Sequence, residues 1–192
     1  MLNKQEFAKI RKEIDDFDRK RENVIQLSRE IINISKRVIY SLHRDDIKAA
    51  ANYVKEINKK KAHLDKINIP LDTNMSSIAY QEYTEALAYF NFIKSKKIPT
   101  KASLKVPTED YLMGLCDLTG ELGRKAVNES IKKNFKKAFE IKGVVEDIYG
   151  EFLKFNLRNS ELRKKSDAIK WNLQKLEDLV FDLKIKGKLK TK

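Results

Sequence analysis

The sequence predicts an all-α fold, and three observations support this. Glycine and proline together number only nine among 192 residues, under half of the roughly 12% found in average proteins. The first glycine is Gly114, although a sheet protein needs turn residues every ten or so positions. Apolar residues instead recur at steps of three and four, as in amphipathic helices. All-β folds are therefore excluded, repeated βαβ units are disfavoured, and the regular apolar spacing argues against disorder.

The first expected helix is unusually long. Its apolar stripe runs from Phe7 to Leu42 in steps of three, four or seven, and about 38 helical residues extend about 57 Å. A compact domain of this length has a radius of gyration near ~16 Å. Because the helix would project beyond a spherical domain, we expect an elongated bundle or an oligomer.

Two further helices and a loop follow. Asp45 and Asp46 are expected to supply first-turn acids for a second helix that reaches Leu64. Pro70 and the polar stretch 72–74 separate it from a third helix over roughly 75–95. Residues 98–107, which contain two prolines, predict the clearest loop of the chain.

The second half of the chain predicts three more helices, six in all. Thr108 is expected to cap a fourth helix that reaches about 132, and the fifth carries an apolar stripe from Ile141 to Phe155. Asn159 or Ser160 caps the sixth, which Gly187 ends. We expect one domain over residues 1–187 and a lysine-rich tail over 188–192.

The chain is strongly basic, with 41 Lys and Arg against 28 Asp and Glu and a net charge of +13. Residues 1–66 and 151–192 each carry +6, so the middle is nearly neutral. The lone cysteine, Cys116, cannot form an internal disulfide, which fits a reducing compartment. The N-terminus lacks the apolar stretch of a signal peptide, and the apolar runs are too short to cross a bilayer. We expect a soluble cytoplasmic protein without a membrane partner.

Two acid pairs in the neutral middle are candidate metal ligands. Glu82 and Glu85 are three residues apart on the third expected helix, and Asp117 and Glu121 are four apart on the fourth, so each pair shares a helix face. Carboxylates suit hard cations such as Mg²⁺, which assists displacement at phosphorus. Spacing alone also fits solvated faces or helix salt bridges, so both interpretations stay open here.

Other kinds of site are excluded or unsupported. A di-iron bundle needs Glu-x-x-His, but Tyr40 and Lys60 stand three positions before His43 and His63. We expect both histidines to be ordinary surface or packing residues, and Cys116 to be a buried structural thiol. The chain has no glycine-rich phosphate loop and no G-x-S-x-G motif.

Two glycines inside the fourth expected helix predict a close helix contact. Gly114 and Gly120 each cost about 1 kcal/mol relative to alanine in a helix. A close approach of a second helix at these positions would offset that cost.

Five segments resemble motifs of the translin family, in order and across nearly the whole chain. They are LSREIINISKRVIYSLHR at 27–44, QEYTEALAYFNFIK at 81–94, DYLMGLCDLTGELGRKAVN at 110–128, FNLRNSELRKKSD at 155–167 and KLEDLVFDLKIKG at 175–187. The resemblance implies an all-α, translin-like bundle of about seven helices. It also implies assembly into an oligomeric barrel, with eight subunits expected.

The resemblance also implies an activity. Catalytic members of the family use an E-x-x-E pair and a D-x-x-x-E pair to bind Mg²⁺ and cleave RNA, and Glu82, Glu85, Asp117 and Glu121 match all four positions. We expect a Mg²⁺-dependent endoribonuclease, with Mn²⁺ as an alternative ion, that cleaves RNA with accessible single strands and leaves 5′-phosphate and 3′-hydroxyl ends. The C-terminal motif is closer to translin, whereas the acids resemble its partner subunit. One chain holding both suggests a homo-oligomer of the single-subunit, archaeal type.

Basic residues are expected to contact RNA phosphates on the inner wall of the barrel. The candidates are Arg19, Lys20, Arg21, Arg29, Lys36, Arg37 and Arg124. Two other functions stay open. One is a non-catalytic protein that binds RNA or single-stranded DNA, and the other is a structural helical oligomer with no nucleic-acid role.

Overall fold

The computed structural model describes residues 2–67 and 74–188. Within these ranges the chain forms helices and no strand. The helices are α1 (Lys4–His43), α2 (Ile47–Leu64), α3 (Met75–Ser95), α4 (Lys101–Leu104), α5 (Thr108–Ile131), α6 (Phe135–Phe152) and α7 (Glu161–Ile185). The all-α prediction is confirmed.

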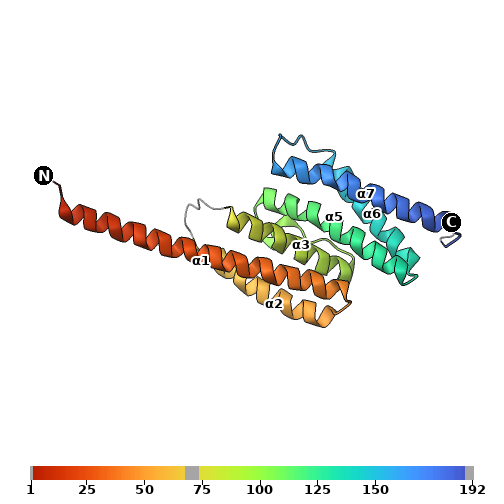
Figure 1. The fold of residues 1–192 in the computed structure, drawn as a ribbon, viewed down its shortest axis with the longest axis horizontal. Coiled ribbons are helices and arrows are strands. Elements are labelled where there is room, and N and C mark those ends of the chain that lie inside the picture. The colour runs from red at the N-terminus through yellow and green to blue at the C-terminus, as the bar shows by residue number, and fades with distance from the viewer. Residues whose placement is uncertain (1, 68–73, 189–192) are drawn as a thin grey trace.

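The long helices pack side by side in a row, with α3 and α5 in the middle (Figure 1). Helices α1 and α2 pack together on one side, where α1 lies along α3. Helices α6 and α7 pack on the other side against α5. This order makes the α3–α5 contact the centre of the bundle, and both predicted acid pairs lie on these two helices.

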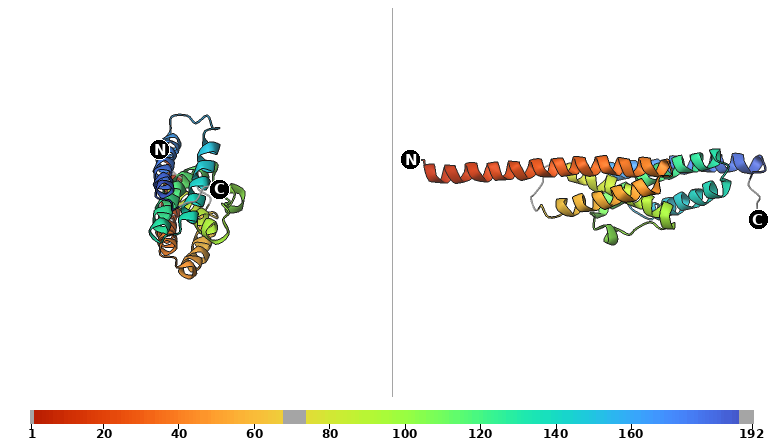
Figure 2. Two further views of the ribbon diagram at one scale, coloured as in Figure 1. Left: turned by 90° about the vertical axis from the view of Figure 1, so that its right-hand side faces the viewer. Right: turned by 90° about the horizontal axis from the view of Figure 1, so that it is seen from below.

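Helix α1 projects far beyond the other helices at its N-terminal end (Figures 1 and 2). Its buried residues begin at Val24 and continue to Leu42, so the first five turns lie outside the core. The side chain of Asn3 caps the helix by accepting hydrogen bonds from the backbone N–H groups of Gln5 and Glu6. The projection expected from the length of the stripe is confirmed.

Several predicted boundaries need correction in the first half of the chain. Asp46 is the N-cap of α2 and accepts a hydrogen bond from the N–H of Ala49, while Asp45 lies in the preceding turn at φ 60°. The expected loop contains the short helix α4, which Thr100 caps. The N-cap of α5 is Pro107, whereas Thr108, the predicted cap, is the first residue of the helix. Pro70 and residues 72–73 lie outside the described residues.

In the second half, the predicted stripe extends to Phe155, but α6 ends at Phe152. Phe155 therefore lies outside the helix, and this part of the prediction is wrong. Ser160 caps α7 by accepting from the N–H of Arg163. Gly187 follows the helix at φ +65°, which is the left-handed conformation that favours glycine. Residues 189–192 of the expected tail lie outside the described residues.

Gly114 lets α3 and α5 approach closely. A Cβ atom at this position would lie 2.7 Å from both the carbonyl oxygen of Gln81 and the Cβ of Thr84. The predicted close contact is therefore confirmed at Gly114. It is wrong for Gly120, whose nearest neighbour would be the side chain of Asn172 at an ordinary 3.7 Å.

In the part of the chain that is described, no helix combines the length and apolarity needed to cross a lipid bilayer.

Candidate functional site

The four predicted acids, Glu82, Glu85, Asp117 and Glu121, face one another across the α3–α5 contact. Glu85 is buried, whereas the side chains of Asp117 and Glu121 are 35% and 24% exposed. Burial raises the pKa of Glu85 to about 9, and the nearby charges of Asp117, Glu82 and Glu121 add to this effect. Burial also raises the pKa of Glu82, although Lys36 opposes the shift. The acids thus form one electrostatically coupled group, hereafter the acid group.

Protein cations from two distant helices compensate part of this negative charge. Lys165 of α7 donates from Nζ to Asp117 Oδ2 at 2.5 Å and to Gln81 Oε1 at 3.2 Å. Lys36 of α1 acts on Glu82 through its charge. No basic residue lies between Lys66 and Lys94 in the sequence. The neutralising charge that is missing from the local sequence is therefore supplied by tertiary structure.

His43, at the C-terminal end of α1, contacts the acid group directly. Its Nε2 meets Glu121 Oε2, and the Tyr89 hydroxyl lies 3.4 Å from its Nδ1. The His43 side chain is only 6% exposed. The expectation of an ordinary surface or packing residue is wrong for His43, because its partners belong to the site. His63 is exposed, as expected.

Sequence reasoning missed both Lys165 and His43 as site residues. Each lies inside a segment that carried the family resemblance, FNLRNSELRKKSD for Lys165 and the SLHR end of 27–44 for His43. Their place inside these family-like segments was the one signal in the sequence that could have marked them as site residues. Neither residue is near an acid of the site in the sequence, so spacing rules could not link them.

Two surface hollows open onto the acid group. One, of about 570 Å³, is lined by Glu82 and Asp117 together with Lys165. The other, of about 320 Å³, is lined by Glu82, Glu85 and Glu121 and is bordered by basic residues. Because Glu82 lines both, a solute that enters either hollow meets the acid group.

The donor set fits a hard divalent cation, although the side chains are not gathered around one point. Within residues 2–67 and 74–188, no three His, Cys, Asp or Glu side chains stand close enough together to hold a metal ion. Asp117 is turned to Lys165 and Glu121 to His43. The donors are all carboxylate oxygens, which Mg²⁺ and Mn²⁺ prefer. To bind a metal ion together, the acids would have to release the Lys165–Asp117 and His43–Glu121 contacts.

The predicted RNA-contacting residues fall into three places. Lys36 and Arg124 line the smaller hollow, where Arg124 lies 3.9 Å from Glu121. Arg29 lies two turns before Lys36 and so shares its face of α1. Arg37 lies on another face, with its guanidinium carbon 5.9 Å from the centre of the Tyr53 ring. The others, Arg19, Lys20 and Arg21, lie on the projecting part of α1.

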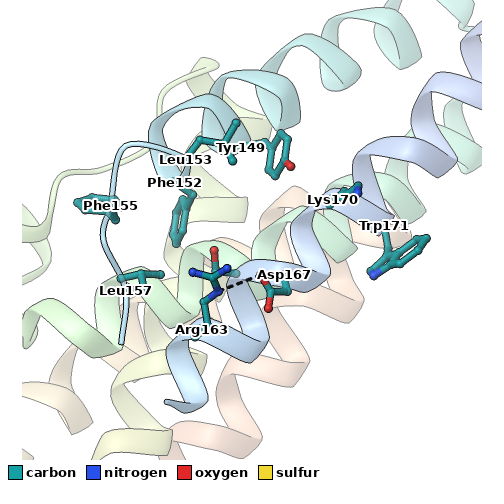
Figure 3. A pocket seen from close by; sticks show the side chains of 10 residues that line it. Tyr149, Phe152, Leu153, Phe155, Leu157, Arg163, Asp167, Lys170 and Trp171 are labelled. Carbon is teal, nitrogen blue, oxygen red and sulfur yellow. Dashed lines mark ion pairs between the residues drawn. The ribbon is translucent and has the colours of Figure 1, made fainter. Parts of the chain in front are cut away.

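A third hollow, of about 470 Å³, lies between α6 and the start of α7 (Figure 3). It contains none of the predicted acids. Its one carboxylate, Asp167, forms an ion pair with Arg163 at 3.2 Å, and aromatic and aliphatic side chains line most of the rest. This hollow therefore lacks the donor set found at the α3–α5 contact.

Comparison with known proteins gives one family and several relatives. The family model described as "Translin family" matches residues 19–187. Translin-associated protein X of Rattus norvegicus is 26% identical over 228 aligned residues, which cover 94% of this chain and 78% of that protein. Translin of Gallus gallus is 37% identical over 79 residues, or 41% of this chain and 34% of that protein.

Solved structures show the same fold. The crystal structure of apo-NeC3PO superposes with a TM-score of 0.86 at 32% sequence identity and covers 94% of this chain and 97% of its own. The structure of an AfC3PO–duplex RNA complex superposes with a TM-score of 0.83 at 26% identity and the same coverage. The similarity extends over nearly the whole bundle.

Proposed function

The chain belongs to the translin family, and from this premise we propose that it is a Mg²⁺-dependent endoribonuclease. Its substrate is single-stranded RNA, or RNA with accessible single strands, and its products carry 5′-phosphate and 3′-hydroxyl ends. The observation that carries the proposal is the buried Glu85 beside three further carboxylates on two facing helices. The similarity to a protein whose structure contains duplex RNA supports RNA as the ligand.

The acid group is costly for the fold unless a cation compensates it. Burying a carboxylate removes its hydration, and neighbouring carboxylates add repulsion. Glu85 lies at the α3–α5 contact, where an apolar residue would pack at lower cost. A function that requires negative charge at this place explains why the four acids are present.

The acids are the proposed metal ligands, and surrounding residues hold them. A divalent ion at this place supplies positive charge that stabilises negative charge on a phosphate and activates water. In the metal-free protein Lys165 holds Asp117, and His43, itself near the Tyr89 hydroxyl, holds Glu121; a bound ion would replace these two contacts. Lys36 and Arg124, at the edge of the smaller hollow, contact phosphates of the RNA and position it. Mn²⁺ is the alternative ion.

A cleavage assay tests this function. End-labelled RNA is incubated with wild type or Asp117→Asn, in Mg²⁺ and in chelator, and RNA retention on a filter is measured in parallel. We expect wild type to cleave only with Mg²⁺, and Asp117→Asn to retain RNA while losing at least about 10²-fold in rate. Asp147→Asn, a change at an exposed position on α6, is the matched control and should cleave like wild type. Intact RNA with wild type in Mg²⁺ would overturn the proposal.

The second candidate is a non-catalytic protein that binds RNA or single-stranded DNA. The observation that favours it is that Asp117 and Glu121 are already engaged by Lys165 and His43. In this case wild type and Asp117→Asn both retain RNA and neither cleaves it. A purely structural oligomer would lack the salt-dependent RNA retention of a phosphate-binding protein, which weakens as salt rises from about 50 to 200 mM.

We also propose that the protein assembles into a homo-octameric barrel in the cytoplasm, with residues 1–187 as its single domain. Similarity to both translin and translin-associated protein X supports one subunit type that does the work of both. Light scattering should then give eight times the 22.4 kDa mass of one chain. A 22.4 kDa particle at micromolar concentration would contradict the assembly.

A further inference from the structure

The projecting part of α1, residues 4–21, carries an apolar stripe that nothing in the described part of the chain covers. Phe7, Ile10, Ile14 and Phe17 are 43%, 41%, 54% and 37% exposed, and burial on α1 begins only at Val24. The right-hand view of Figure 2 shows no other helix beside this part. The match to the family model begins at residue 19, after the last residue of the stripe.

The stripe has the spacing of a coiled-coil seam. Its members are separated by three, four and three residues, which are the a and d positions of two heptads. The same heptad continues through Val24, Ile31 and Val38, where α2 and α3 cover the seam. Most helical stability in proteins comes from packing of the apolar face, and residues 4–21 have no packing partner in the described part of the chain. The first two heptads thus have the pattern of a helix that pairs with another helix.

We propose that residues 4–21 of α1 pair with the same residues of a second copy of this chain, in the antiparallel orientation. Antiparallel pairing about the middle of the segment sets Phe7 opposite Phe17 of the second copy and Ile10 opposite Ile14. All four apolar residues of each copy then meet an apolar residue of similar size. The two-fold symmetry makes the contact closed, because each surface is its own complement.

The charges beside the seam select the antiparallel orientation. In this arrangement Lys4 lies beside Asp18 of the second copy, and Glu6 lies beside Lys20. Symmetry produces each pair twice, which gives four attractive contacts. Such flanking charges determine partner choice and orientation in coiled coils more than they determine stability.

The parallel arrangement has poorer charge complementarity. It sets Glu6 beside Arg11, but it also sets Glu13 beside Asp18, so two attractive pairs are cancelled by two repulsive ones. The antiparallel pair has two repulsive contacts as well, where Arg11 and Glu13 each meet their own copy, against its four attractive contacts. The balance therefore favours the antiparallel pair.

The rest of the bundle favours the same orientation. From Val24 onward α2 and α3 occupy the seam, so a parallel partner would have to leave it abruptly at that point. An antiparallel partner simply ends there, since its own N-terminus lies at that level. The two copies of Val24 would then be about 36 Å apart along the helix axis, and the two bundles lie at opposite ends of the pair.

Sedimentation of the full-length protein tests the proposal. We expect Ile14→Asp to give a smaller particle than wild type at the same concentration, and Asp18→Lys to weaken association by about tenfold or more. Restoring the pair in Lys4→Asp/Asp18→Lys should return association toward wild type. An unchanged mass for Ile14→Asp overturns the proposal. Stronger association of Asp18→Lys overturns the orientation, because it is the result for a parallel pair.

Cysteine cross-linking gives an independent test. The native Cys116 is buried and does not compete. Ile10→Cys/Ile14→Cys should form disulfide-linked dimers under oxidation, whereas Ile10→Cys alone should not, because identical positions meet only in a parallel pair. If Ile14→Asp dissociates the particle but the double cysteine variant does not cross-link, the stripe docks elsewhere on a second copy, such as the hollow in Figure 3, and the proposal is wrong. RNA cleavage is scored separately, so failure here leaves the nuclease proposal intact.

Discussion

Glu85 is the one acid of the four whose side chain is buried, and this burial, together with the charges of its neighbours, raises its pKa. Three carboxylates lie near it, while Lys165 and His43 are directed to Asp117 and Glu121. A divalent ion would therefore do most to offset the burial of the Glu85 carboxylate and its repulsion by the neighbouring acids. The fold is less stable with this carboxylate than it would be with a neutral side chain, and the proposed function accounts for that cost.

Replacing Glu85 with glutamine should separate stability from function. We expect Glu85→Gln to raise the stability of the metal-free protein by about 1–2 kcal/mol, or roughly 2–8 °C in melting temperature for a chain of this size. The same change should abolish the stabilisation of wild type by millimolar Mg²⁺. Calorimetry in chelator and in Mg²⁺ measures both effects. Glu56→Gln, at an exposed position on α2, should change neither; a Mg²⁺ response that survives in Glu85→Gln contradicts the assignment of this ligand.

Single residues of the site were predictable only where a local pattern marked them. The four acids carry helical spacing and match family motifs, so the sequence alone was enough to propose them. Lys165 and His43 are 48 and 78 positions from their acidic partners. No periodicity links such positions, since their contacts depend on how α1 packs on α3 and how α7 packs on α5.

Among the helices, the α3–α5 contact determines how the acids are spaced. Gly114 allows this contact because its missing side chain makes room for the backbone of Gln81 and the side chain of Thr84. A Cβ atom added at Gly123, on the same helix, would meet no described atom of a neighbouring helix within 4 Å. The two glycines thus differ in their surroundings while sharing one helix.

Gly114→Ala should destabilise the protein although alanine favours helices. The helix propensity gain of about 1 kcal/mol is outweighed by overpacking, which typically costs about 1–3 kcal/mol, because the carbonyl of Gln81 cannot move aside without moving α3. Gly123→Ala should instead be neutral or stabilising by up to about 1 kcal/mol. Urea unfolding measures both. Equal effects of the two substitutions would show that the close contact does not limit the packing of α3 on α5.

The turn between α1 and α2 is tied to α5 by charge. Asp45 accepts a hydrogen bond from Lys125 Nζ at 2.6 Å and also contacts Lys132. These two lysines lower the pKa of Asp45 from 3.8 to about 2. Because the folded value is the lower one, the contact stabilises the protein above about pH 4 and is lost as the pH falls from 3.8 toward 2.

Asp45→Asn should therefore lower stability at pH 6 and flatten the loss of stability between pH 4 and pH 2. Thermal unfolding at pH 6, 4 and 3 gives the two slopes. Asp182→Asn, whose carboxylate is exposed and 3.6 Å from Lys186, is the control and should follow wild type. If Asp45→Asn and wild type lose stability in parallel over this range, the turn is not held by this contact.

Elements were predictable to the extent that their signals are local. The long helices follow from apolar periodicity, and Ser160 and Gly187 act as the sequence suggests because caps depend on neighbouring residues. Helix α4 has only four residues, too few for any period to appear. Thr108 has the chemistry of a cap, but Pro107 occupies the cap position because proline fixes the backbone just before the helix.

For the whole molecule, the row of helices gives the uneven charge of the sequence a spatial meaning. The basic N-terminal region forms α1 and α2, and the basic C-terminal region contains α7; α1 and α7 lie on opposite sides of the central α3 and α5. Lys36 and Lys165 reach the acid group from these two sides. The contacts of the proposed oligomer could not be derived from the sequence, because they involve residues of different copies.

The most direct measurement of metal binding by the acid group is an anomalous difference map from crystals grown with Mn²⁺. We expect its strongest peak between α3 and α5, in direct contact with carboxylate oxygens of the acid group, with Lys165 moved away from Asp117. A map with its strongest peaks elsewhere, and with Asp117 and Glu121 still held by Lys165 and His43, would show that the acid group is not a metal site.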